Sequence, residues 1–204
     1  MGVDTAIILI AFVLVAAAVA FVVLDMGMTS AQKAKQTMES GLQQASTALQ
    51  VNGEVMAYVN PNGYVEDIFI PLGVTPGTGY VSFAKNLLSV SLIAGNMSYA
   101  NIYEGVNETI LNSGTSNLTA LAKFLGTDTK YKDKTVALVY FIHGNITPFV
   151  LGPYGQALLV IHLPQGLPAY KSFTVTISPS IGGAITVSRI IPPNNVTNTV
   201  IDLG

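Results

Sequence analysis

The sequence predicts an α+β protein, in which one long N-terminal α-helix precedes an antiparallel β-sandwich of immunoglobulin-like type. Ala6 to Leu24 forms a run of nineteen residues without a polar side chain, and more polar helix-forming sequence follows it. Beyond residue 51, short apolar segments alternate with turn sequences, which is typical of antiparallel sandwiches. We therefore expect a helical segment over residues 1–51 and a β-sandwich domain over residues 52–204.

The apolar run has the length of a membrane-spanning helix. At 1.5 Å per residue it extends about 28 Å, close to the ~30 Å hydrocarbon core of a bilayer. Thirteen of its residues are Ile, Leu, Val or Phe, and they favour membrane insertion by about 4–8 kcal/mol. The others are alanines, which allow close approach of neighbouring helices. Apolar residues occupy every side of the helix, which argues against an ordinary core helix with one buried face.

The beginning of the sequence lacks the pattern of a removed signal peptide. No Lys or Arg precedes Lys33, and the apolar run passes directly into helix-forming sequence. A secretory signal has a basic start and a small-residue cleavage site. We therefore expect a retained transmembrane or assembly helix.

After Asp25 the helix is predicted to carry a single apolar seam. The 3,4 spacing of an amphipathic helix is followed by Met28, Ala31, Met38, Leu42, Ala45 and Leu49, with Lys35 in the one polar seam position. The helix is predicted to end near Val51, before Asn52-Gly53.

The remainder of the chain is predicted to be β-rich, with one short helix at Thr119–Leu125. Turn sequences such as Asn60-Pro61-Asn62-Gly63 separate the apolar segments. The expected strands are Glu54–Val59, Tyr64–Ile70, Leu87–Ala94, Met97–Tyr103, Thr135–His143, Ala157–His162, Ser172–Ser178, Ala184–Ile191 and Thr199–Asp202.

Composition and motifs argue against catalysis, cofactors and nucleic acid. The charged fraction is 10% and the formal charge is −2, so no basic surface for nucleic acid is expected. The chain has no cysteine, and His143 and His162 are each expected at a strand end without a nearby carboxylate, which makes a weak metal site. Glu66 and Asp67 are adjacent in an expected strand and would point to opposite faces. The lysines at 130, 132 and 134 are interpreted as a solvated face.

Five asparagines match the acceptor pattern for N-glycosylation, Asn-X-Ser/Thr. These candidates are Asn96, Asn107, Asn117, Asn145 and Asn195. Chance alone gives two or three matches in a chain this rich in Asn and Thr. Five favour a surface-exposed glycoprotein, with Asn145 the weakest candidate because Pro148 follows its sequon.

Asp4 precedes the apolar run within one helical turn of Met1. A carboxylate there stabilises the helix N-terminus. In an apolar bundle it would also pair with the amine of a neighbouring subunit, since an unpaired charge in such surroundings costs several kcal/mol. The two interpretations are compatible, and the sequence does not choose between them.

The N-terminal quarter resembles the mature archaellins, the archaeal flagellins. The resemblance lies in MGVDTAIILIAFVLVAAAVAFVVLDMG and SAQKAKQTMESGLQQASTALQVNGEV, and the end ITVSRIIPPNNVTNTVIDLG is similar to archaellin C-termini. It implies a short basic leader cut off by a prepilin-type peptidase, and assembly like type IV pilins with helices at the filament axis and β-sandwich domains outside. It further implies an extracellular filament, turned by an ATPase-driven membrane motor, for swimming and often attachment.

Under this hypothesis the protein is a structural subunit whose partners are other copies of itself, and the membrane before assembly. The absence of a leader suits a mature chain. Two alternatives remain open: an archaeal adhesion pilin, or a membrane-anchored extracellular β-domain; an enzyme is a distant third. The residues expected in the assembly helix are Asp4, Ile7, Ile10, Phe12, Leu14, Val15, Ala18, Phe21, Leu24, Met28, Met38 and Leu42.

Overall fold

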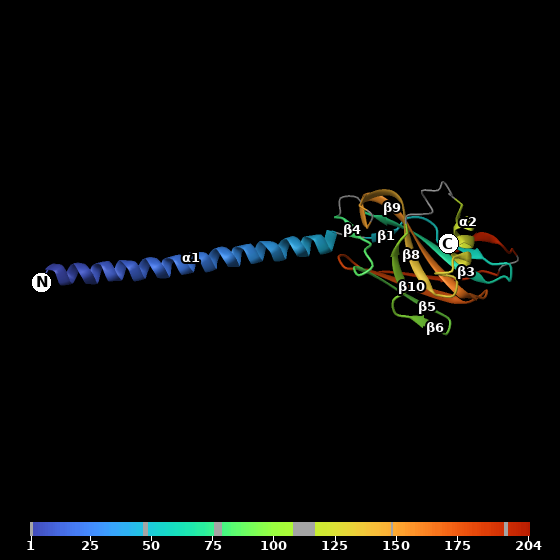
Figure 1. The fold of residues 1–204 in the computed structure, drawn as a ribbon, viewed down its shortest axis with the longest axis horizontal. Coiled ribbons are helices and arrows are strands. Elements are labelled where there is room, and N and C mark those ends of the chain that lie inside the picture. The colour runs from blue at the N-terminus through green and yellow to red at the C-terminus, as the bar shows by residue number, and fades with distance from the viewer. Residues whose placement is uncertain (1, 47–48, 76–78, 108–116, 148, 194–195) are drawn as a thin grey trace. The chain divides into compact units, whose positions relative to one another are not determined.

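The computed structural model describes residues 2–46, 49–75, 79–107, 117–147, 149–193 and 196–204 (Figure 1). The chain divides into two compact units, Met1–Leu42 and Gln43–Gly204. The first unit is helical and the second contains the β-sheets.

The first unit belongs to one α-helix, α1 (Gly2–Ser46), which continues through Gly41 without a break. The predicted end near Val51 is wrong, because Leu49–Val51 forms strand β1 and pairs with Leu72–Val74. Leu49 therefore does not extend the helical seam; it is buried in the core of the β domain. Burial against the sheet outweighs the weak preference of this segment for helix.

The larger sheet has eight strands in the order β12-β2-β3-β9-β8-β7, with β1 beside β3 and β4 beside β9. All pairs are antiparallel except β7 with β8, which is parallel. The strands are β1 (Leu49–Val51), β2 (Met56–Val59), β3 (Val65–Val74), β4 (Val81–Ser82), β7 (Tyr103–Val106), β8 (Val136–Thr147), β9 (Val150–Leu167) and β12 (Thr199–Asp202).

The second sheet has the order β11-β10-β5-β6, and β10, β5 and β6 are labelled in Figure 1. Its strands are β5 (Leu88–Ala94), β6 (Met97–Tyr99), β10 (Ser172–Pro179) and β11 (Ile185–Ile190). Phe173, Val175 and Ile177 alternate inward along β10 and share one hydrophobic core with side chains of the larger sheet. The two sheets therefore form a sandwich, which confirms the predicted class of a long helix followed by mostly antiparallel sheets.

Helix α2 (Leu118–Thr127) contributes to a second apolar cluster with the larger sheet. Asn117 caps it: the Asn117 side chain accepts a hydrogen bond from the Thr119 amide. Leu121 and Leu125 pack in that cluster with Phe69 of β3 and Tyr140 of β8. This helix lies where the sequence predicted one, extended at both ends. The apolar cluster around α2 and the sandwich core each contain residues of the larger sheet. Central strands of that sheet are therefore apolar on both sides.

The central strands are longer than predicted. Strand β9 has eighteen residues, while the sequence predicted only Ala157–His162. Pro153 and Pro164 lie within β9, and both fall where the pairing register of β9 with its neighbours shifts. Proline is tolerated in sheets at such irregularities. The structure also contains two short strands that the sequence analysis missed, β4 and the separate β7.

Strands β8 and β9 approach each other so closely at Gly144 that there is no room for a side chain. Gly144 has φ +77°, and a Cβ there would lie 2.6 Å from the Cα of Gly155. We expect Gly144→Ala to lower the free energy of unfolding of the β domain by about 2 kcal/mol or more, since the left-handed conformation alone costs about 1–2 kcal/mol. All nine tyrosines lie beyond residue 51, so tyrosine near-ultraviolet circular dichroism of the detergent-solubilised chain measures this unfolding.

Gly183→Ala is the matched control, since a Cβ at Gly183 meets nothing within 4 Å. It should change the stability by less than about 0.5 kcal/mol. Equal stabilities of the two variants would contradict the close packing of β8 on β9.

Candidate assembly surface

The surface of α1 is uncovered from Gly2 to Leu42. Every residue from Gly2 to Leu42 is exposed, including the largest side chains; Phe12 is 74% exposed and Leu24 73%. The helix is long and apolar enough to cross a membrane by length and composition. It has no buried face within the chain, unlike an ordinary amphipathic helix.

This exposure identifies α1 as a surface that must be covered by something else. Burying a large aliphatic or aromatic side chain contributes about 1.5–3 kcal/mol, so thirteen of them represent about 20–40 kcal/mol of unrealised burial in water. Lipid or other helices can supply that cover. All twelve residues expected in the assembly helix lie on α1 and are exposed.

Asp4 lies in the first turn of α1 and is exposed. That position suits the positive end of the helix dipole. Beyond Asp25, exposed apolar side chains continue at Met28, Met38 and Leu42 among charged and polar residues. An ion pair on this helix joins Lys35 to Glu39 at 3.7 Å, in an i,i+4 arrangement that contributes little to stability.

The five candidate glycosylation sites differ in their surroundings. Asn96, in the β5–β6 turn, and Asn117, at the start of α2, are exposed. Asn107 is half-buried. Asn145 lies in β8 with its side chain outside the description, and Asn195 lies outside the described residues. Among these, Asn96 and Asn117 are the accessible acceptors.

A buried histidine–carboxylate pair crosses from β9 to β3. His162 Nδ1 lies 2.7 Å from Asp67 Oδ1, and both side chains are fully buried. His162 Nε2 lies 3.5 Å from the carbonyl oxygen of Lys132. A carboxylate and a carbonyl are both acceptors, so the imidazole satisfies both only when each nitrogen carries a proton, unless Asp67 itself supplies one.

The sequence analysis missed this pair: it placed His162 at a strand end without a carboxylate nearby, which is wrong. His162 lies within β9 and is paired in register with Asp67. The available signal was a polar residue inside each of two strongly apolar strands. Which strands are neighbours is a long-range property that neither segment reveals.

The pair holds its protons more tightly in the folded chain than in the unfolded chain. Burial raises the pKa of Asp67 to about 6, although the hydrogen bond from His162 opposes this. Burial lowers the pKa of His162, but the hydrogen bond and charge of Asp67 outweigh it, and its net pKa is raised. The charge of Glu66 acts in the same direction on both groups.

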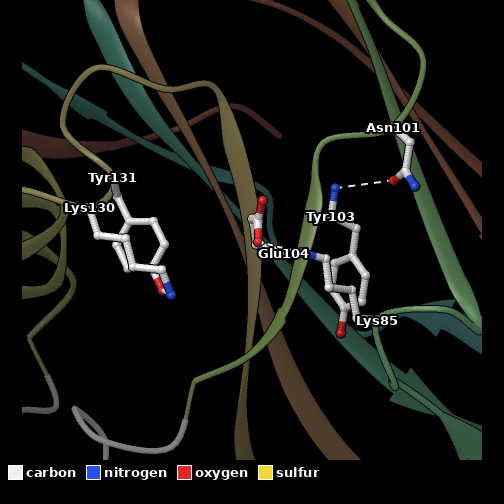
Figure 2. Close-up of polar contacts among 6 residues, drawn as sticks. All are labelled: Lys85, Asn101, Tyr103, Glu104, Lys130 and Tyr131. Carbon is white, nitrogen blue, oxygen red and sulfur yellow. Dashed lines mark hydrogen bonds and ion pairs between the residues drawn. The ribbon is translucent and has the colours of Figure 1, made fainter.

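The lysines near residue 130 border a small hollow. Figure 2 shows Lys85 reaching Glu104, with their ion pair at 2.7 Å, and Lys130 beside Tyr131. Glu104, Lys130, Tyr131, Lys134 and Val136 line a hollow of about 120 Å³, below the ~300 Å³ of typical ligand sites. Lys130, Lys132 and Lys134 are exposed, in agreement with a solvated face.

Comparisons with known proteins decide the family. The model of the archaeal-type flagellin family matches residues 1–189. A probable flagellin 1 of Aeropyrum pernix is 38% identical over 203 residues, covering all of this chain and 96% of the relative.

The chain belongs to the archaeal-type flagellins.

Solved structures show the same fold. The archaeal flagellum of Methanospirillum hungatei strain JF1 has a TM-score of 0.64 at 20% identity, covering 95% of each chain. The crystal structure of archaeal flagellin FlaB1 from Methanocaldococcus jannaschii has a TM-score of 0.61 at 17% identity, covering 77% of this chain and 96% of that one.

The flagellin family is one of structural filament subunits for motility, so this protein is not an enzyme, and the resemblance to archaellins is confirmed. The family match therefore favours a flagellin filament subunit over the alternatives of an adhesion pilin and a permanently anchored β-domain. In the part of the chain that the structure describes, no group of three or more His, Cys, Asp or Glu residues is placed to hold a metal ion.

The buried pair predicts a pH dependence of this flagellin's β domain. The contribution of His162 is present below its ordinary pKa of about 6.5 and is lost as the pH rises through its raised folded pKa. The contribution of Asp67 to stability changes with pH in the same direction, because its raised pKa favours folding at lower pH. We expect the tyrosine-detected melting temperature to fall as the pH rises from about 5 to about 9.

His162→Gln should lower stability by about 3 kcal/mol near neutral pH, since it leaves a buried carboxylate without its partner. His143 is exposed on β8, so His143→Gln should reproduce the native pH profile. A native profile identical to that of His162→Gln would contradict a role of the pair in stability.

Proposed function

We propose that this flagellin assembles into an extracellular filament through α1, with many α1 helices bundled together and the β domains outside them. The observation that carries the proposal is the exposure of α1 from Gly2 to Leu42, with a surface that is apolar on every side up to Leu24. Bundling places those side chains against each other, and the alanines at 16–18 and 20 permit close approach of helix backbones.

The membrane supplies the cover for α1 before assembly. Residues 6–24 match the hydrocarbon thickness of a bilayer as a helix. Transfer from lipid into a bundle exchanges one apolar environment for another, so its free-energy difference is set by packing and by hydrogen bonds. A precursor held in this way waits for assembly without exposing α1 to water.

A contact between copies that does not close on itself extends without limit. Such a head-to-tail contact generates an open helical polymer. In that bundle the exposed carboxylate of Asp4 would meet the N-terminal amine of a neighbouring copy. Pairing of the two charges would fix the axial position of one subunit against the next, because an unpaired charge among apolar helices is costly.

The same proposal includes two kinds of partner taken from the likeness to archaellins. A prepilin-type peptidase would process the precursor ahead of the apolar segment. A membrane platform with an ATPase-driven motor would insert subunits and turn the filament. The filament serves swimming, and adhesion would be a second use of the same surface.

A charge in the middle of α1 tests the bundle. Val15→Lys should abolish filaments, because a lysine inside a packed apolar bundle has neither water nor an acidic partner. The measurement is electron microscopy of material sheared from cells that carry the variant as their only copy of the gene, with swimming scored in parallel. Val15→Leu is the control and should form filaments.

Normal filaments from Val15→Lys would contradict a buried α1. Recovery of the native protein solely in detergent extracts of membranes would contradict assembly itself.

We further propose that the exposed sequons carry glycans. At Asn117 the cap hydrogen bond uses the backbone amide of Thr119. Thr119→Ala therefore removes the sequon while it preserves the cap. We expect the intact mass of sheared native filaments to exceed 21.4 kDa, and to fall by one glycan in Thr119→Ala and in Ser98→Ala.

Asn62→Gln is the control, since Asn62 is exposed but stands outside any sequon. It should leave the glycan mass unchanged. An unmodified native mass would refute the glycoprotein hypothesis.

A further inference from the structure

A group of exposed apolar side chains surrounds the β8–β9 hairpin. We name it the hairpin surface and define it as Tyr80, Ile142, Phe149 and Tyr154, which are 61%, 54%, 51% and 71% exposed. Large apolar side chains gathered on a surface mark interaction sites more often than single exposed ones do.

Pairing brings these four residues to one end of the larger sheet. Tyr80 precedes Val81, which pairs with Leu151 of β9. Phe149 accepts a hydrogen bond from the Phe83 amide at 2.7 Å, which joins the turn to the segment after β4. On β8, Ile142 precedes His143, whose partner on β9 is Gln156, two residues from Tyr154.

The hairpin surface carries no formal charge. The sequence contains no Asp, Glu, Lys or Arg from Ile142 to Gln156 or from Tyr80 to Phe83. Charged residues are depleted and aromatic residues enriched in the centres of protein interfaces. The chemistry of the surface therefore suits an apolar protein partner.

The same end of the sheet receives the chain from α1. Strand β1, which follows α1 after two residues, pairs with Leu72–Val74 at the end of β3. There, Leu72 and Gly73 are in register with Ala157 and Gln156 of β9, at the base of the β8–β9 hairpin. The hairpin surface is thus on the part of the β domain next to the junction with α1.

A second uncovered apolar feature ends beside that junction. We name it the methionine seam: Met28, Met38 and Leu42, which are 65%, 75% and 71% exposed. It follows Asp25 and lies beyond the bilayer-length apolar run. Leu42 is four residues from the end of α1, about 6 Å along the helix axis.

The side chains of the two features are complementary. Methionine is flexible and makes favourable contacts between its sulfur and aromatic rings. Phe149 and the two tyrosines of the hairpin surface offer such rings. In a polymer of identical chains, every copy carries both features, so the hairpin surface of one copy and the methionine seam of another are available to each other.

We infer that the hairpin surface binds the methionine seam of α1 from a neighbouring copy of the chain. The inference rests on the proposed assembly through α1 and adds a second contact to it. The contact joins the β domain of one subunit to the helix of another, and so fixes the β domain on the helical bundle.

Two tyrosines provide a matched test. Tyr154 and Tyr170 are 71% and 73% exposed, and both have positive φ, at 62° and 64°. They lie toward opposite ends of the eighteen-residue strand β9, with Tyr170 beyond its last residue. Tyr154→Lys should reduce the yield of sheared filaments about tenfold or more, the expected effect of losing one central contact; Tyr170→Lys should leave the yield unchanged.

Folding and the proposed function are monitored separately. The tyrosine-detected melting temperature of Tyr154→Lys should equal that of Tyr170→Lys. If the melting temperature of Tyr154→Lys is lower, Phe149→Lys replaces it as the test variant. If native cells yield no filaments, the proposed function fails. If native filaments form and both tyrosine variants assemble equally well, the inference alone is overturned.

Disulfide trapping identifies the segment that binds the hairpin surface. The sequence has no cysteine, so only the introduced cysteines can form disulfides. Cells would produce two chains together, one carrying Tyr154→Cys and the other Leu42→Cys. Mild oxidation of their filaments should link unlike chains, as shown by mass spectrometry of the non-reduced dimers. The pair Tyr170→Cys with Leu42→Cys should give no such dimer.

Equal linkage in both pairs, or none in either, would overturn the inference. Dimers formed only between two Tyr154→Cys chains would also overturn it, because they would place a second β domain on the hairpin surface in place of α1.

Discussion

The constraint on which this structure depends is that α1 cannot be covered by its own chain. A helix that is apolar on every side needs an apolar environment that surrounds it. Lipid does so for a single chain, and identical helices do so for many chains. The proposed stage in the membrane and the polymerisation would therefore depend on the same surface.

The β domain differs from α1, since most of its apolar strand residues are buried in two clusters, although the hairpin surface remains exposed. Its larger sheet has a sandwich core on one side and the cluster around α2 on the other. The buried side chains of His162 and Asp67 pair with each other, while the second carboxylate oxygen of Asp67 and the hydroxyl of Tyr140 are buried without a hydrogen-bond partner among the described residues. The β domain has a hydrophobic core made from its own residues.

Much of this division was predictable from local patterns. The apolar run, the change of pattern after Asp25 and the alternating β segments are signals within a few residues of each other, and they gave the class of fold and the position of α2. The end of α1 was not predictable, because Leu49 is drawn into the sheet by a partner more than twenty residues away. The Asp67–His162 pair was missed for the same reason, since it joins residues 95 positions apart.

The presence of α1 was predictable from the sequence because a uniformly apolar helix is recognised without long-range information, and the role of its residues in assembly stays a prediction. The surroundings of the sequons were not predictable, since they depend on which turns reach the surface. The hairpin surface depends on the crossing of β8 and β9, with Gly144 against Gly155. That crossing arises from strand pairing, and local hydrophobicity alone does not distinguish its exposed aromatics from core residues.

The short strand β1 also determines how a turning filament would load its subunits. Any tension or torque that reaches the β domain along α1 enters through Leu49–Val51, the first residues hydrogen-bonded to a sheet. Strand β3 passes that load to β9, and β9 passes it to β8, along the most extensively paired strands of the domain. Antiparallel strands loaded along their length share force among many hydrogen bonds at once. In the proposed rotating filament the thrust would thereby be distributed over the central strands of the sheet.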